Sequence, residues 1–174
     1  MNLKTVKIIG VFNIFLLAFL AHFVNDFCHN MLSFSLFPVN ESIWEHMKLL
    51  FTPFIINTVI FYFIGKKKEN NLLLQLFLVP VTSIVIYLMI YLPIYNMWGE
   101  NLIISILLLF VVICFEQLFS YFLATYEQGK LSNVIGFIGL FLVFFIFAYL
   151  TYFPLENYLF LDTNSNSYGI IYKD

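Results

Sequence analysis

Residues 38–48 carry the densest group of polar side chains in the chain. This segment reads PVNESIWEHMK and contains two carboxylates, an imidazole and an ammonium group directly before a long apolar run. Glu41, Glu45 and Lys48 follow one another at spacings of four and three residues, which places them on one stripe of a helix. His46 points about 100° away from Glu45 around the same helix. These side chains can therefore act together at one end of the apolar run.

A second polar group lies at the end of the first apolar run. At about 100° per residue, its members fall within one arc of a helix surface. They are His22, Asn25, Asp26 and His29. If the two helices are antiparallel neighbours, the two polar stripes meet at the same membrane boundary.

The combined residue types suit a divalent metal such as zinc, for which imidazole and carboxylate are ordinary ligands. The predicted metal ligands are His22, Asp26, Glu41 and Glu45. Glu45 and His46 are also the candidate catalytic residues, as metal ligand or as general base. The spacing is much less specific than an H-E-x-x-H motif.

The same segment also has structural explanations. Ser42 and Glu45 form an S-x-x-E capping box, which would satisfy backbone amides at a helix start. Trp44 is typical of the aromatic belt at a membrane interface. Glu45 can pair with Lys48 on the next turn. A third interpretation is a polar site that couples ions or docks a partner, and the sequence leaves all three open.

The composition of the chain indicates that membrane-spanning helices position these polar side chains. Of the 174 residues, 62% are hydrophobic and 10% charged, whereas soluble domains are about a quarter charged. The sequence therefore predicts an all-α integral membrane protein, and the absence of a basic patch beyond one Lys triplet argues against nucleic acid binding. Five apolar runs are long enough to span a bilayer as helices, within a transmembrane domain over 1–153 and a tail over 154–174. The runs are 5–27, 43–65, 72–93, 101–125 and 132–153.

The lysines predict the orientation, because short cytoplasmic loops are enriched in them. With the N-terminus inside, six of the eight basic residues are cytoplasmic and only Lys48 and Lys173 are outside. This arrangement makes the tail extracytoplasmic. It also gives the outer face a net charge of about −5, which attracts cations.

Several polar residues and prolines lie inside the predicted spans. Pro53 and Pro80 each remove a backbone hydrogen bond and should kink their helices. Glu116 lies well inside the fourth span, where an unpaired charge is costly, so it needs hydrogen-bonding partners. Its expected partners are Asn13, Asn57 and Gln75. These groups form either interhelical hydrogen bonds or part of a proton or substrate path.

Three further features receive structural interpretations. Cys28 and Cys114 lie at different depths, so both are expected to be free thiols. Gly136 and Gly139 favour either close helix packing or a lipid-facing wall. Asp162 begins a tail segment that imitates a calcium loop, but the Gly and Glu that such a loop requires are absent, so a turn stabilised by Asx side chains is predicted.

The segment from Pro38 to Phe51, followed by Pro53, resembles a family of small bacterial multi-pass membrane proteins that is known by a numbered domain of unknown function. His22-Phe23 before this block, and Asp162 with Tyr168-Gly169-Ile170 after it, extend the resemblance over most of the chain. The resemblance implies a bacterial cytoplasmic membrane protein and implies no chemistry. The tail departs from the family pattern, because DTNSN stands where that family has a turn with Pro and Gly.

Three functions are consistent with these observations. The first is a metal-dependent membrane hydrolase or transferase that acts on a lipid-like substrate at the outer leaflet. The second is a subunit of an oligomeric transporter, because five spans make a monomeric transporter improbable. The third is a non-catalytic accessory protein whose outer acids dock a membrane protein partner. No nucleophile motif, phosphate loop or cofactor fingerprint is present, so the sequence leaves enzyme status open.

Overall fold

The computed structural model describes residues 2–65, 69–129 and 131–170. Five helices in this part of the chain are long and apolar enough to cross a membrane: Leu3–Phe27, Ile43–Ile64, Leu72–Trp98, Leu102–Thr125 and Ser132–Tyr152. The predicted all-α, five-span fold is therefore confirmed, and the chain is a multi-pass membrane protein. The Lys66–Lys68 triplet, Lys130 and Lys173, which carry much of the orientation prediction, lie outside the described residues.

The described residues form five long helices and three short ones. The helices are α1 (Leu3–His22), α2 (Val24–Phe27), α3 (Met31–Leu36), α4 (Ile43–His46), α5 (Lys48–Gly65), α6 (Leu72–Trp98), α7 (Leu102–Thr125) and α8 (Ser132–Tyr152). After α8, β1 (Leu161–Asp162) pairs antiparallel with β2 (Ser167–Tyr168). Asx side chains begin several helices, as when Asn101 accepts from the Ile104 amide at the start of α7.

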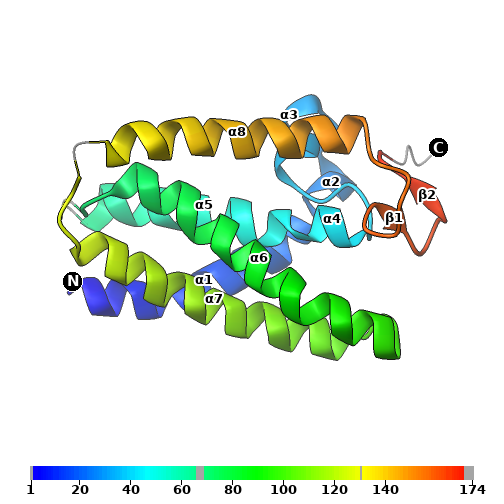
Figure 1. The fold of residues 1–174 in the computed structure, drawn as a ribbon, viewed down its shortest axis with the longest axis horizontal. Coiled ribbons are helices and arrows are strands. Elements are labelled where there is room, and N and C mark those ends of the chain that lie inside the picture. The colour runs from blue at the N-terminus through cyan, green and yellow to red at the C-terminus, as the bar shows by residue number, and fades with distance from the viewer. Residues whose placement is uncertain (1, 66–68, 130, 171–174) are drawn as a thin grey trace.

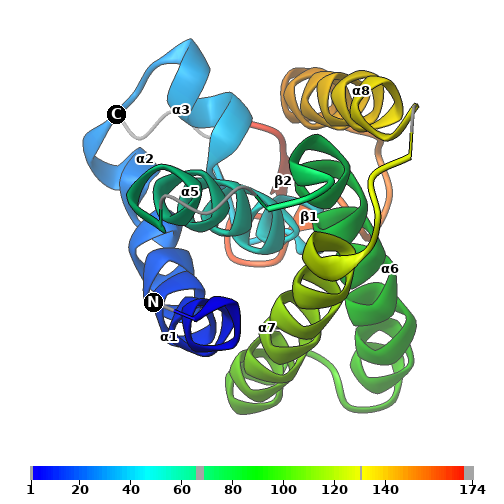
Figure 2. The same ribbon diagram turned by 90° about the vertical axis from the view of Figure 1, so that its left-hand side faces the viewer.

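The long helices run side by side along the molecule, with α8 along one edge and α1 and α7 along the opposite edge (Figure 1). In the view along the helices, α5 and α6 lie between these edges (Figure 2). α1 packs on α5 and α7, while α6 packs on α7 and α8. The N-terminus lies at one end of the molecule, and α2, α3, α4 and the β-hairpin gather at the other (Figure 1). This second end holds the polar residues of the 38–48 segment.

Two predicted spans are interrupted where their polar residues lie. α1 ends at His22 and the chain turns at Phe23, and Met47 separates α4 from α5. Asn25 holds the short α2 by donating to the carbonyls of Phe37 and Pro38 at 3.0 and 2.9 Å. Because α2 ends at Phe27, His29 is outside the helix, and the predicted stripe from His22 to His29 does not form.

The third span is longer than predicted, because α6 continues through Pro93 to Trp98. Proline removes one hydrogen bond of the helix, but the turn beyond it is held by packing, since Tyr95 lies against the hydrophobic core. Pro53 and Pro80 also lie inside their helices.

α8 combines close packing on one face with lipid exposure on another. A Cβ atom on Gly136 would lie 2.4 Å from the backbone of Leu73 in α6, so glycine permits the backbones to touch. Gly139 lies in the same way against the Phe77 ring. Elsewhere on α8, Phe137 and Phe141 are more than half exposed. Such apolar surface is suited to contact with the lipid bilayer.

Candidate metal centre

Three side chains from separate segments converge where α1 ends. His22 is the last residue of α1, His46 the last of α4, and Glu41 lies in the loop before α4. The Nε2 atoms of His22 and His46 are 3.3 Å apart. Each of these nitrogens lies 3.4 Å from Oε2 of Glu41. The three donor atoms therefore form a nearly equilateral triangle.

The edges of this triangle fit a metal ion better than hydrogen bonds. Nitrogen–oxygen hydrogen bonds in proteins are usually about 2.9–3.0 Å long, shorter than the contacts to Glu41. Around a tetrahedral zinc ion with bonds of about 2.0–2.1 Å, neighbouring ligand atoms lie about 3.3–3.4 Å apart. His22, Glu41 and His46 thus provide one face of a tetrahedral site. Two histidines and one glutamate are also a ligand set of catalytic zinc sites.

A backbone carbonyl sets the tautomer of His46. Its Nδ1 lies 2.8 Å from the carbonyl oxygen of Ser42, which can only accept a hydrogen bond, so Nδ1 is the donor. In the neutral ring, Nε2 is then unprotonated and directs its lone pair toward the triangle. Outer contacts of this type fix the ring orientation of metal-ligating histidines.

The ionisation of Glu41 also favours cation binding. In the metal-free protein, protonated His22 and His46 rings lower the pKa of Glu41 below its ordinary value of 4.5 through their contacts with its carboxylate and their charge, outweighing the opposing effect of burial. Its side chain is 37% exposed, and those of the two histidines are 29% and 28% exposed. The donor atoms are therefore accessible from outside, with the carboxylate ionised at neutral pH.

A cavity of about 320 Å³ adjoins the three residues, which form part of its wall. Apolar side chains such as Ala18, Leu49 and Leu109 line much of it. Tyrosines of α6 line one side, and Glu100, Tyr158 and Thr163 also contribute to the wall. A mainly apolar cavity with a few converging polar groups is the usual form of a small-molecule site.

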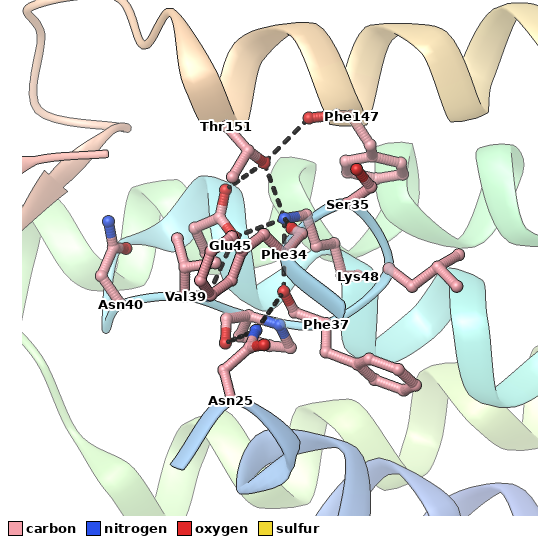
Figure 3. Close-up of polar contacts among 12 residues, drawn as sticks. Asn25, Phe34, Ser35, Phe37, Val39, Asn40, Glu45, Lys48, Phe147 and Thr151 are labelled. Carbon is pink, nitrogen blue, oxygen red and sulfur yellow. Dashed lines mark hydrogen bonds and ion pairs between the residues drawn. The ribbon is translucent and has the colours of Figure 1, made fainter. Parts of the chain in front are cut away.

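Glu45 lies in a different network from its neighbour His46 (Figure 3). Its Oε2 is 2.6 Å from Nζ of Lys48, and its Oε1 accepts a hydrogen bond from Thr151 of α8 at 2.9 Å. Lys48 also donates to Thr151 and to the Phe34 carbonyl. Glu45 and Lys48 are only 2% and 1% exposed. This buried cluster joins α3, α4, α5 and α8.

The predicted capping box is half formed. The Ser42 hydroxyl accepts from the Glu45 amide at 3.3 Å, but the Glu45 carboxylate accepts from the Val39 amide instead of that of Ser42. The Ser42 amide donates to Asn40 Oδ1. Trp44 stacks on Phe160 of the tail, with ring centroids 4.9 Å apart, so it packs inside the protein at this point.

Two other predicted residues stand apart from the triangle. Among the described residues, the one group of ligating atoms close enough to share an ion is His22, Glu41 and His46, without Asp26 or Glu45. Asp26 lies on α2 beyond the turn at Phe23. His29 packs its ring against Phe34. Cys28 and Cys114 are free, as expected.

The residues expected to hydrogen-bond Glu116 have other positions or partners. Gln75 accepts from Ser120 at 2.7 Å and lies near Lys7, whose ammonium group pairs with Glu69 at 2.8 Å. Asn13 is half-buried on α1.

Glu116 itself is fully buried, with Ser83 of α6 beside it. Neither of its oxygens has a hydrogen-bond partner within the described part of the chain, and Oδ1 of Asn57 has none there either. The half of the bundle nearer the N-terminus thus contains, among the described residues, a paired cluster at Lys7 and a buried carboxyl group at Glu116 without a hydrogen-bond partner.

The residue pattern of the sequence groups His22 with Glu41, but it predicts Asp26 and Glu45 as further metal ligands and gives His46 a catalytic role as ligand or base. Helical periodicity favoured this grouping, because Glu41 and Glu45 are four residues apart. Glu41 precedes α4, so its side chain does not follow the helical spacing that relates it to Glu45. The sequence feature that marks the site is therefore a pair: Glu41 in the loop before α4, and His46 at the last position of that one-turn helix.

No curated protein and no solved structure shows significant similarity to the chain. The model of one protein family, described as a family of unknown function (DUF6512), matches residues 1–170. This match confirms the resemblance to a numbered family of unknown function. The chain therefore belongs to the family DUF6512.

Proposed function

We propose that His22, Glu41 and His46 bind one divalent metal ion such as zinc, and that the protein is a metal-dependent hydrolase or transferase of a lipid-like substrate. The observation that carries this proposal is the triangle of donor atoms with edges of 3.3 and 3.4 Å. The apolar cavity beside the triangle supports a substrate with a hydrocarbon part. A bilayer supplies such molecules directly at this depth.

The residues have separate roles in this proposal. His46 and His22 supply neutral nitrogen ligands, and the Ser42 carbonyl keeps the His46 ring in the required tautomer. Glu41 supplies one negative charge. Zinc in such a site lowers the pKa of a bound water to about 7 and polarises an ester or amide carbonyl. The cavity wall would hold the hydrocarbon part of the substrate so that its polar bond lies at the ligands.

The proposal includes a location and an orientation. We place the protein in the bacterial cytoplasmic membrane with its N-terminus inside, so that residues 154–174 and the metal centre face outward. The lysine distribution supports this orientation. Reporter fusions after Lys68 and at Asp174 test it, and a cytoplasmic signal from the second fusion would contradict it.

Hydrolysis of 4-nitrophenyl laurate, a chromogenic ester with one long chain, tests the chemistry. The purified zinc-loaded protein should release nitrophenol, lose this activity on chelation, and regain it with added zinc. His46→Gln should abolish the activity. His29→Gln is the matched control, because this histidine lies outside the triangle. Hydrolysis that resists chelation, or equal activity of the two variants, would refute the proposal.

A second candidate function, a subunit of an oligomeric transporter, is supported by the membrane interior. Buried polar atoms of Glu116, Ser83, Gln117, Asn57 and Thr58 lack hydrogen-bond partners among the described residues. Unpaired polar groups are costly inside a membrane and often mark ion or proton paths. Proton flux into liposomes that contain the protein, compared with its Glu116→Gln variant, tests this function. Equal flux in both preparations would exclude a path through Glu116.

A further inference from the structure

Three tyrosines of α6 line the cavity beside the metal centre. Tyr87, Tyr91 and Tyr95 line the same wall at intervals of one helical turn. Their rings follow one another, with centroid separations of 5.2 and 5.8 Å. From Tyr87 to Tyr95 the helix rises about 12 Å, at about 1.5 Å per residue. The row of tyrosines is therefore long enough to contact a hydrocarbon chain that lies parallel to α6.

The ionisable residues of the cavity wall come from helix ends and loops. His22 and His46 end α1 and α4, Glu41 precedes α4, and Glu100 lies just beyond the end of α6 that carries Tyr95. The rest of the wall is mainly apolar, with residues such as Ala18 and Leu109, although Ser105 lies beside Tyr91. This division between ionisable and mainly apolar residues matches a molecule with one head group and one chain.

The charge of the cavity wall is negative. Glu41 and Glu100 are the acidic residues of the wall, and no Lys is among the described residues that line it. Lys48, on the same end of the molecule, is 1% exposed and already paired with Glu45. Sites for phosphate normally present Arg, Lys or helix amide groups. Apart from a metal ion bound at the triangle, the cavity therefore offers no Lys or Arg side chain of the described residues to a phosphate-bearing lipid.

Glu100 is held in the cavity wall by the tail. Its Oε2 accepts a hydrogen bond from the Thr163 hydroxyl at 3.0 Å, and both residues line the cavity. The Trp44 amide donates to the Leu159 carbonyl at 2.8 Å, and this bond anchors the tail in the same region. The Glu100 carboxylate is thus positioned beside the tyrosine wall. Tyrosine faces attract cations, so both features favour a positively charged group.

We infer that the ligand of this cavity is a single-chain amphiphile with a protonated amine in its head group. The ammonium group would lie between Glu100 and Tyr95, and the chain would extend along Tyr91 and Tyr87. Glu100 is then the residue that selects the charge of the head group. This inference rests on the proposed function in one respect: it names the substrate class of the same cavity.

Three probes with identical chains test the charge preference: dodecylamine, dodecanol and dodecyl phosphate. Each is added to the protein in phosphatidylcholine nanodiscs, and affinity is taken from the rise of the unfolding temperature with probe concentration. In the wild-type protein, dodecylamine should bind on the order of tenfold more tightly than dodecanol, as a surface charge pair together with a cation–π contact implies. In protein treated with a chelator before the assay, dodecyl phosphate should bind more weakly than both, because a metal ion at the triangle would itself attract the phosphate.

Two variants isolate Glu100. Glu100→Gln should bind dodecylamine and dodecanol equally well, whereas Glu156→Gln should keep the preference. Glu156 is an exposed acid at the same end of the molecule, outside the cavity wall, so it controls for the general surface charge. Equal affinities for amine and alcohol in the wild-type protein, or an unchanged preference in Glu100→Gln, would overturn the inference.

Zinc content is measured on the same samples and separates this test from that of the metal centre. An amine preference that depends on Glu100 supports the inference even in a protein without zinc, and in that case the metal proposal alone fails. A zinc-loaded protein without the preference refutes the inference and leaves the metal proposal standing.

Discussion

The Nε2 atoms of His22 and His46 lie 3.3 Å apart, although the two residues are 24 positions apart in the chain. Between them the chain forms α2, α3 and the loop that carries Glu41. Glu45, next to His46 in sequence, belongs instead to the buried cluster with Lys48. Adjacent residues of one helical turn therefore take part in two networks, one accessible from the cavity and one buried against α8.

The buried cluster should contribute strongly to stability. Lys48→Met leaves the Glu45 carboxylate buried without its cation, and removal of one partner of a buried pair costs about 3–5 kcal/mol. We expect a loss of this size in the free energy of unfolding, measured by denaturant titration in detergent micelles. The double variant Glu45→Gln/Lys48→Met should recover part of the loss, because no unpaired charge remains. A double variant less stable than Lys48→Met would contradict this explanation.

Close contact between α6 and α8 depends on Gly136. A Cβ atom there would lie 2.4 Å from the Leu73 backbone, and backbone cannot move aside as a side chain can. Gly136→Ala should therefore lower the free energy of unfolding by about 1–3 kcal/mol, the usual range for overpacking. Gly129→Ala is the control, because a Cβ atom there would meet nothing within 4 Å. Equal stability of the two variants would show that the helices are not in contact at Gly136.

The lowered pKa of Glu41 predicts a pH effect on the metal-free protein. The folded protein binds a proton at Glu41 less readily than the unfolded chain, whose pKa is near the ordinary value of 4.5. The stabilisation is therefore complete above this value and is lost as the pH falls below it. Glu41→Gln should show a smaller loss of thermal stability between about pH 5 and pH 3. Parallel curves for the two proteins would argue against the contacts of Glu41 with the imidazoles.

The sequence was sufficient to predict the five spans, because apolar runs of about 20 residues have few alternatives to helix in a membrane. It also located the polar end of the molecule. It did not predict where the first two spans are interrupted, since the turn at Phe23 depends on bonds from Asn25 to the distant carbonyls of Phe37 and Pro38. A model of continuous helices consequently assigned Asp26 and His29 to the face of His22.

The prediction of Glu45 as a metal ligand also came from helical spacing. Helical spacing relates Glu45 to Glu41 and to Lys48 equally well, and only tertiary packing decides between them. Thr151, more than 100 residues later, accepts from Lys48 and donates to Glu45, and it thereby fixes the pair against α8. For Gly136 the sequence allowed either close helix packing or a lipid-facing wall. The contact with the Leu73 backbone shows that close packing is correct.

The zinc content of five purified proteins tests the metal centre most directly. After exposure to excess zinc and removal of unbound ions, the wild-type protein should retain about one zinc per chain, as a three-residue ligand set of the catalytic type predicts. His22→Ala and Glu41→Ala should retain almost none, while Asp26→Asn and Glu45→Gln should match the wild type, with folding of each variant checked by its unfolding transition. Absence of zinc from the folded wild-type protein, or full retention in folded His22→Ala, would contradict a metal centre formed by His22, Glu41 and His46.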